Sequence, residues 1–74
     1  MKYVKIIDGD KREHLIRKDS IVRISKDIDY DSTNGKSIYK IYYILQWGYV
    51  SEKFDNYEDR DAVFDSMQRE LEDE

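Results

Sequence analysis

The segment Ser32-Thr33-Asn34-Gly35-Lys36 lies between two runs rich in β-branched and aromatic residues, and it decides the fold. Asn-Gly between two such runs predicts a β-hairpin, because both residues tolerate a positive φ. The run before this segment carries four apolar side chains of one parity, as a half-buried strand does: Val22, Ile24, Ile28 and Tyr30.

The run after the hairpin alternates over ten residues, from Ile38 to Trp47. Gly48 then permits a turn or bulge, and residues 49–54 form a last short strand. Working outward toward the N-terminus, residues 3–7 and 13–17 read as two further strands, separated by the turn signal Asp8-Gly9-Asp10-Lys11. The pattern predicts an antiparallel sheet of four to five strands over about residues 2–54.

The apolar period changes at Asp55, which forms a capping-box-like helix start with Glu58. The apolar residues that follow fall within an arc of about 120°, the width of a core-facing helix stripe: Tyr57, Val63, Phe64, Met67 and Leu71. We expect one C-terminal amphipathic helix over about residues 57–72. Strands followed by one helix indicate an α+β fold, with residues 1–74 forming a single small domain.

The composition excludes several classes of protein. The 74 residues include no cysteine and no proline, so neither a disulfide framework nor a thiolate metal site is available. No apolar run could serve as a signal peptide or cross a membrane, and we therefore expect a cytoplasmic protein without membrane contact. A chain this short buries only about 60% of its unfolded surface, which favours a homodimer.

The net charge of −4 is unevenly divided. Residues 1–54 carry eleven Lys/Arg and eight Asp/Glu, a net of +3, whereas residues 55–74 carry two Arg and nine Asp/Glu, a net of −7. Four helix carboxylates fall within about 60° of one another on the helical wheel: Glu58, Asp61, Asp65 and Glu72. This ridge is either a solvated face that keeps a small protein in solution or a surface that binds a basic partner.

The sequence carries no catalytic or metal motif. His14 is the only histidine and has no evident nucleophile near it in the sequence. The run Asp27, Asp29 and Asp31 resembles the start of a calcium loop, but Ser32 and Ile38 stand where an EF-hand needs Gly and Glu. These three acids are better explained as one face of a strand that extends the acidic surface. We expect no enzyme, no cofactor and no metal site.

The aromatic residues suggest a second surface. Seven Tyr, two Phe and one Trp are many for a chain this short, and one helix cannot cover both faces of the central strand. Rings that stay exposed would form a dimer or partner interface or a stacking platform for single-stranded nucleic acid; rings that are covered would belong to the core. The candidate rings are Tyr39, Tyr42, Tyr43 and Trp47.

In size, acidity and the carboxylate ridge, the chain is similar to the small acidic proteins that phages and mobile elements encode against host machinery. The leading hypothesis is therefore a non-enzymatic inhibitor that mimics the charge of DNA and blocks a basic nucleic-acid-binding host protein. Histone-like proteins, RNA polymerase and nucleases are the natural targets. Two alternatives remain: a sheet face that binds single-stranded nucleic acid, and an accessory module whose partner pairs with an edge strand.

Overall fold

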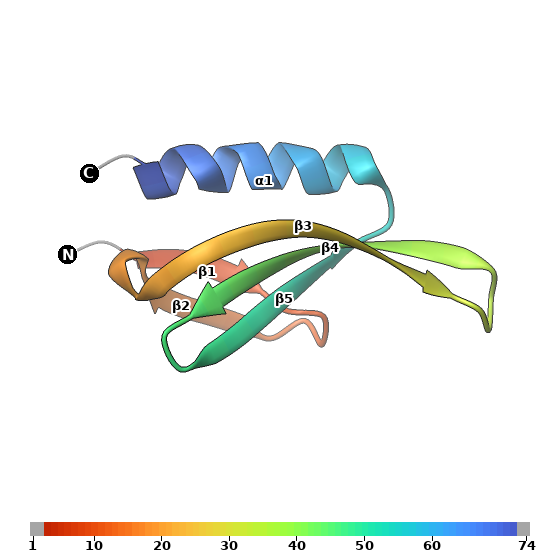
Figure 1. Ribbon diagram of the computed structural model, residues 1–74, viewed down its shortest axis with the longest axis horizontal. Coiled ribbons are helices and arrows are strands. Elements are labelled where there is room, and N and C mark those ends of the chain that lie inside the picture. The colour runs from red at the N-terminus through yellow and green to blue at the C-terminus, as the bar shows by residue number, and fades with distance from the viewer. Residues whose placement is uncertain (1–2, 73–74) are drawn as a thin grey trace.

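The computed structural model of the chain describes residues 3–72 and confirms the α+β class (Figure 1). The five antiparallel strands form two sheets, where the sequence pattern predicted one: β1 pairs with β2, and β3, β4 and β5 form a three-stranded sheet in that order. The elements are β1 (Tyr3–Ile7), β2 (Glu13–Arg17), the short 3-10 helix η1 (Lys18–Ser20), β3 (Ile21–Asp31), β4 (Lys36–Leu45), β5 (Gly48–Phe54) and α1 (Tyr57–Glu72).

The predicted hairpin joins β3 to β4. Gly35 has a φ of 70°, and its N–H donates to the Asp31 carbonyl at 2.8 Å. The Asp31 and Asn34 side chains accept the N–H groups of Thr33 and Lys36, at 2.9 and 3.0 Å. Of the two residues expected to take a positive φ, only Gly35 does so, because the loop spans four residues rather than two.

The three-stranded sheet has one covered face, which we call the inner face. Ile41, Tyr43 and Leu45 of β4 are buried there, and Val50 of β5 lies opposite Tyr43. Both α1 and the β1–β2 hairpin pack on this face, so that one core joins all the elements. The buried side chains of this core are Val4, Ile6, Ile16, Ile41, Tyr43, Leu45 and Val50.

A β-bulge at the start of β3 corrects the predicted parity of that strand. Ile21 pairs with Leu45 and Arg23 with Ile44, so Val22 is the extra residue and is exposed. Ile24 packs against the core as expected. The other two residues of the predicted buried set, Ile28 and Tyr30, are 56% and 69% exposed. The end of the β3–β4 hairpin extends past the first turn of α1 (Figure 1).

Two element boundaries also differ from the predictions. Strand β4 ends at Leu45, so Trp47 lies in the turn before β5 and is 70% exposed. The helix cap is Asn56 rather than Asp55, since the Asn56 side chain accepts the N–H of Asp59 at 2.8 Å. Asp59 occupies the third helical position that the sequence pattern assigned to Glu58.

Polar contacts join the two sheets at the end of β1. The N–H of Gly9 donates to the Ser51 carbonyl of β5 at 3.1 Å. The Tyr43 hydroxyl donates to the carboxylate of Glu52, which also accepts the backbone N–H of Ile7. Burial raises the pKa of Glu52, and these two hydrogen bonds lower it in part. Within residues 3–72, no helix has the length and apolar character needed to cross a membrane.

Candidate interaction surface

The predicted carboxylate ridge lies on the flank of α1 that runs beside β3. Asp61 marks this position, because its Oδ1 lies 3.7 Å from the Nζ of Lys26 on β3. The same Lys26 ammonium lies 5.0 Å from the centre of the Phe64 ring, one helical turn further along α1. The ridge therefore borders the open side of β3, the outermost strand of its sheet.

The acids of β3 lie on the face of the sheet opposite to α1. Asp27 and Asp29 pair with Lys40 and Ile38, and this register places them on the outer face of the sheet. Arg60 of α1 donates from Nη1 to the Asp27 carbonyl at 3.1 Å, which draws the first turns of α1 to the strand. The two predicted acidic sets therefore lie along the β3 edge from opposite faces of the sheet, the α1 ridge on the inner side and the β3 acids on the outer face. We call this surface the acidic edge: Glu58, Asp61, Asp65, Glu72, Asp27, Asp29 and Asp31.

Part of the acidic edge is internally neutralised. Asp61 is half-buried and bonds Arg60, with its Oδ1 at 2.9 Å from Nη2. Asp29 lies 2.7 Å from the Nζ of Lys40, and this bond raises the pKa of Lys40. Asp31 holds the hairpin turn through its contact with Thr33. Sequence alone could not reveal these pairs, because Lys26 and Lys40 approach the acids only through strand register and helix packing.

Within the acidic edge, three carboxylates are exposed and make no ion pair with residues 3–72: Glu58, Asp65 and Asp27. A fourth, Glu72, accepts a long hydrogen bond from the Gln68 amide at 3.4 Å. None of these four carboxylates forms a salt bridge within residues 3–72, and they include three of the four ridge residues.

Exposed apolar groups lie next to the acidic edge. Tyr57, at the first position of α1, is 55% exposed and packs edge-on against Tyr39, with ring centres 6.3 Å apart. Arg60 lies 5.3 Å from the centre of the Tyr39 ring. Ile28 pairs with Tyr39 in the sheet and is also exposed. The sequence pattern assigned Tyr57 and Ile28 to the core, and only the short reach of α1 over the hairpin leaves them accessible.

The four predicted aromatic interface residues do not form one surface. Tyr43 is fully buried in the core and cannot contribute to an interface. Tyr39 faces α1, and Trp47 lies in the β4–β5 turn. Tyr42 alone of the four lies on the outer face, where its ring is 5.7 Å from that of Tyr49. The alternation predicted two faces correctly but could not say which face is covered.

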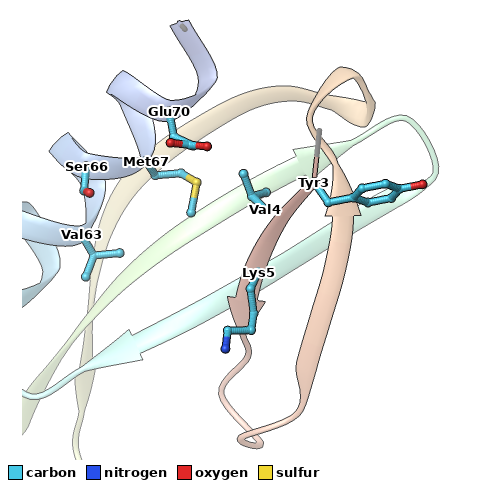
Figure 2. Close-up of a pocket in the computed structure, with 7 residues that line it drawn as sticks. All are labelled: Tyr3, Val4, Lys5, Val63, Ser66, Met67 and Glu70. Atoms are coloured by element: carbon cyan, nitrogen blue, oxygen red, sulfur yellow. The ribbon is translucent and has the colours of Figure 1, made fainter. Parts of the chain in front are cut away.

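The hollow between β1 and α1 encloses about 320 Å³ (Figure 2). Figure 2 shows Val4 of β1 and Met67 of α1 facing each other there. The charged residues on its border are Lys5 and Glu70, one from each element. It is an open seam between two packed elements, with an apolar floor.

A second hollow, of about 390 Å³, borders the β1–β2 turn and contains His14. The Nε2 of His14 lies 2.7 Å from the Oδ2 of Asp8. This bond and the N–H groups of Arg12 and Asp10 lower the pKa of Asp8. Asp8 therefore stabilises the turn between β1 and β2 and fixes the orientation of the His14 ring. Within residues 3–72, no group of three or more His, Cys, Asp or Glu side chains could hold a metal ion.

Comparisons with known families, curated proteins and solved structures each found no match to this chain.

Proposed function

We propose that the chain is a non-enzymatic interaction protein whose acidic edge binds a basic, nucleic-acid-binding protein in the place of DNA. The main support is that carboxylates from α1 and β3, far apart in the sequence, lie along the two faces of a single sheet edge, that of β3. Attraction between opposite charges on two proteins speeds their association over long range, and this attraction weakens as salt is added. In this respect the chain acts as the small inhibitors of phages and mobile elements do.

The neighbouring apolar groups add what charge alone lacks. Binding energy at protein interfaces concentrates in a few aromatic and apolar anchors surrounded by a polar rim. Tyr57 and Ile28 are exposed beside the acidic edge and would supply such anchors. The unpaired carboxylates Glu58, Asp65 and Asp27 would form the rim that meets Lys and Arg of the partner.

The test is competition with DNA. A fluorescent duplex is bound to a histone-like DNA-binding protein, and the chain is titrated in at low salt while anisotropy is followed. The wild-type chain should displace the duplex, and the double variant Glu58→Lys/Asp65→Lys should need at least about tenfold more protein, since each reversal replaces an attraction by a repulsion. Asp61 is left intact because it pairs with Lys26 and Arg60 and supports the fold.

The matched control is Glu13→Lys/Asp10→Lys, which makes the same change in net charge at the end of the β1–β2 hairpin. If the control displaces the duplex as poorly as the double variant does, the total charge of the chain rather than the acidic edge is responsible for the displacement. If the wild-type chain does not displace the duplex from any of three basic targets, a histone-like protein, RNA polymerase and a nuclease, DNA mimicry is wrong.

A second candidate is supported by the outer face of the three-stranded sheet. The ring pair Tyr42 and Tyr49, tilted by 56° to each other, lies there beside Lys40, whose ammonium is 5.8 Å from the centre of the Tyr42 ring. Aromatic rings with nearby cations bind single-stranded nucleic acid by stacking. Fluorescence anisotropy also tests this candidate. Labelled single-stranded DNA should bind the chain directly, and Tyr42→Ala should weaken that binding.

A further inference from the structure

Strands β2 and β3 each lie at the edge of a sheet, and their edges are protected to different degrees. The bulge at Val22 interrupts the regular edge of β3. Arg60 donates a hydrogen bond to the Asp27 carbonyl of the same strand. Natural sheets use such devices, and charged residues in particular, to prevent edge-to-edge pairing. No bulge interrupts the register of strand β2, its charged residues Glu13 and Arg17 lie only at its two ends, and Leu15 at its centre is 70% exposed.

The register of the first hairpin shows which backbone groups of β2 face outward. Asp8 N–H donates to the Arg12 carbonyl at 3.0 Å, so these two residues are a hydrogen-bonded pair. Hydrogen-bonded and non-bonded pairs alternate along an antiparallel ladder. The Lys5–Leu15 pair, three steps further on, is therefore non-bonded. The N–H and C=O of Leu15 point away from β1, as do those of Glu13 and Arg17.

We propose that this open edge pairs with β2 of a second copy of the chain, giving a continuous four-stranded sheet across a two-fold axis at Leu15. Antiparallel pairing centred on Leu15 places its N–H and C=O against those of the partner copy's Leu15. On the same sheet face, Glu13 of each copy then lies opposite Arg17 of the other. The charges of β2 are thus self-complementary in this one register, and an apolar pair lies between them.

The existing contacts of these side chains do not oppose the pairing. Glu13 lies 4.0 Å from the Nζ of Lys5, and Arg17 bonds the carboxylate of Asp19 at 3.0 Å. Both are exposed surface pairs, which contribute little and exchange readily. Arg17 itself keeps an extended backbone, with φ −64° and ψ 135°, so the strand geometry continues to its last residue.

Sedimentation velocity over a range of concentrations tests the proposal on the whole chain. The wild type should dimerise, and Leu15→Lys should raise the dissociation constant of the dimer by about tenfold or more, since two ammonium groups would meet at the axis. Val22→Lys is the matched control, because Val22 is similarly exposed on the other outer strand. Circular dichroism of each variant confirms that the fold is kept.

A charge swap tests the register itself. Glu13→Arg should weaken the dimer, because it faces Arg17 of the partner copy, and Glu13→Arg/Arg17→Glu should restore it. A chain that stays monomeric at concentrations up to about 1 mM would overturn the proposal, because the dissociation constant of the dimer would then lie above that concentration. So would a dimer that Leu15→Lys leaves unchanged. The proposed function does not depend on either result, because the acidic edge lies on other elements.

Discussion

The two faces of the three-stranded sheet carry similar side chains in opposite surroundings. Tyr43 is buried beneath α1 and the β1–β2 hairpin, while its neighbour Tyr42 lies on the open outer face against Tyr49. Ile41 and Ile44 differ in the same way, one buried and one half-exposed. The difference shows that what packs on a strand, rather than the strand's own pattern, decides whether a ring stabilises the fold or serves a surface.

The largest expected effect comes from removing one ring on each face. Tyr43→Ala should lower the free energy of unfolding by about 3 to 5 kcal/mol, because it leaves a cavity and removes the hydroxyl that bonds Glu52. Tyr42→Ala should cost only about 1 kcal/mol, the contribution of an aromatic contact at a surface. Urea denaturation followed by far-UV circular dichroism measures both.

A loss of 3 to 5 kcal/mol approaches the whole stability of a domain this small, by the order of magnitude known for such domains. A milder pair keeps the comparison measurable if Tyr43→Ala does not fold. Ile41→Val should cost about 1 kcal/mol and Ile44→Val clearly less. Equal losses on both faces would mean that the outer face is also covered, as in a different assembly.

The sequence predicted the main elements well because their signals are local. Alternation gave the strands, Asn34-Gly35 gave the hairpin, and the change of period at Asp55 gave the helix. The packing of the two sheets against each other depends on contacts between distant segments, such as that of Gly9 with Ser51, which leave no local signal. For the same reason the pattern listed Tyr43 with surface rings.

The candidate site was only half predictable. The spacing of Glu58, Asp65 and Glu72 placed them on one helix flank, as the structure does. Their position along the β3 edge follows from the packing of α1 on the sheet, which no periodicity encodes. The pairing of Asp61 with Lys26 likewise joins two elements, so the sequence counted Asp61 as a free charge.

A smaller effect should come from the turn that holds the register, on which the assignment of faces depends. A slip of one residue between β3 and β4 would exchange the two faces of the slipped strand. Gly35 has a φ of 70°, so Gly35→Ala should cost about 1 kcal/mol, the strain of a left-handed alanine. Asn34→Ala should cost less, because Asn34 has no positive φ and loses only its bond to the Lys36 N–H.

Thermal unfolding of the two hairpin variants provides the measurement. Neither substitution should change the register between β3 and β4, so hydrogen exchange of the β4 amides should keep the wild-type pattern. If Asn34→Ala proves the more harmful, the side-chain bond rather than the backbone of Gly35 holds the turn.

The smallest expected effect concerns Glu52, the one carboxylate on the inner face. Its neighbours on that face of β5 are apolar, and burial raises its pKa above the ordinary value of 4.5. A raised pKa in the folded chain means that the unfolded chain loses its proton first as the pH rises. Stability should therefore fall as the pH rises from about 4.5 through the folded-state value, and be fully present below that window.

Glu52→Gln removes this titration but keeps an oxygen that can accept from the Tyr43 hydroxyl and the Ile7 N–H. Compared with the wild type, the variant should therefore gain stability as the pH rises from 4 to 7, measured by urea denaturation at each pH. Asp29→Asn is the control, because Asp29 lies on the outer face and its carboxylate is half-exposed beside Lys40. The free energies of unfolding of Glu52→Gln and wild type could instead differ by the same amount at both pH values. That result would mean that the Glu52 carboxylate is solvated like an outer-face group and that the inner face is open to water at β5.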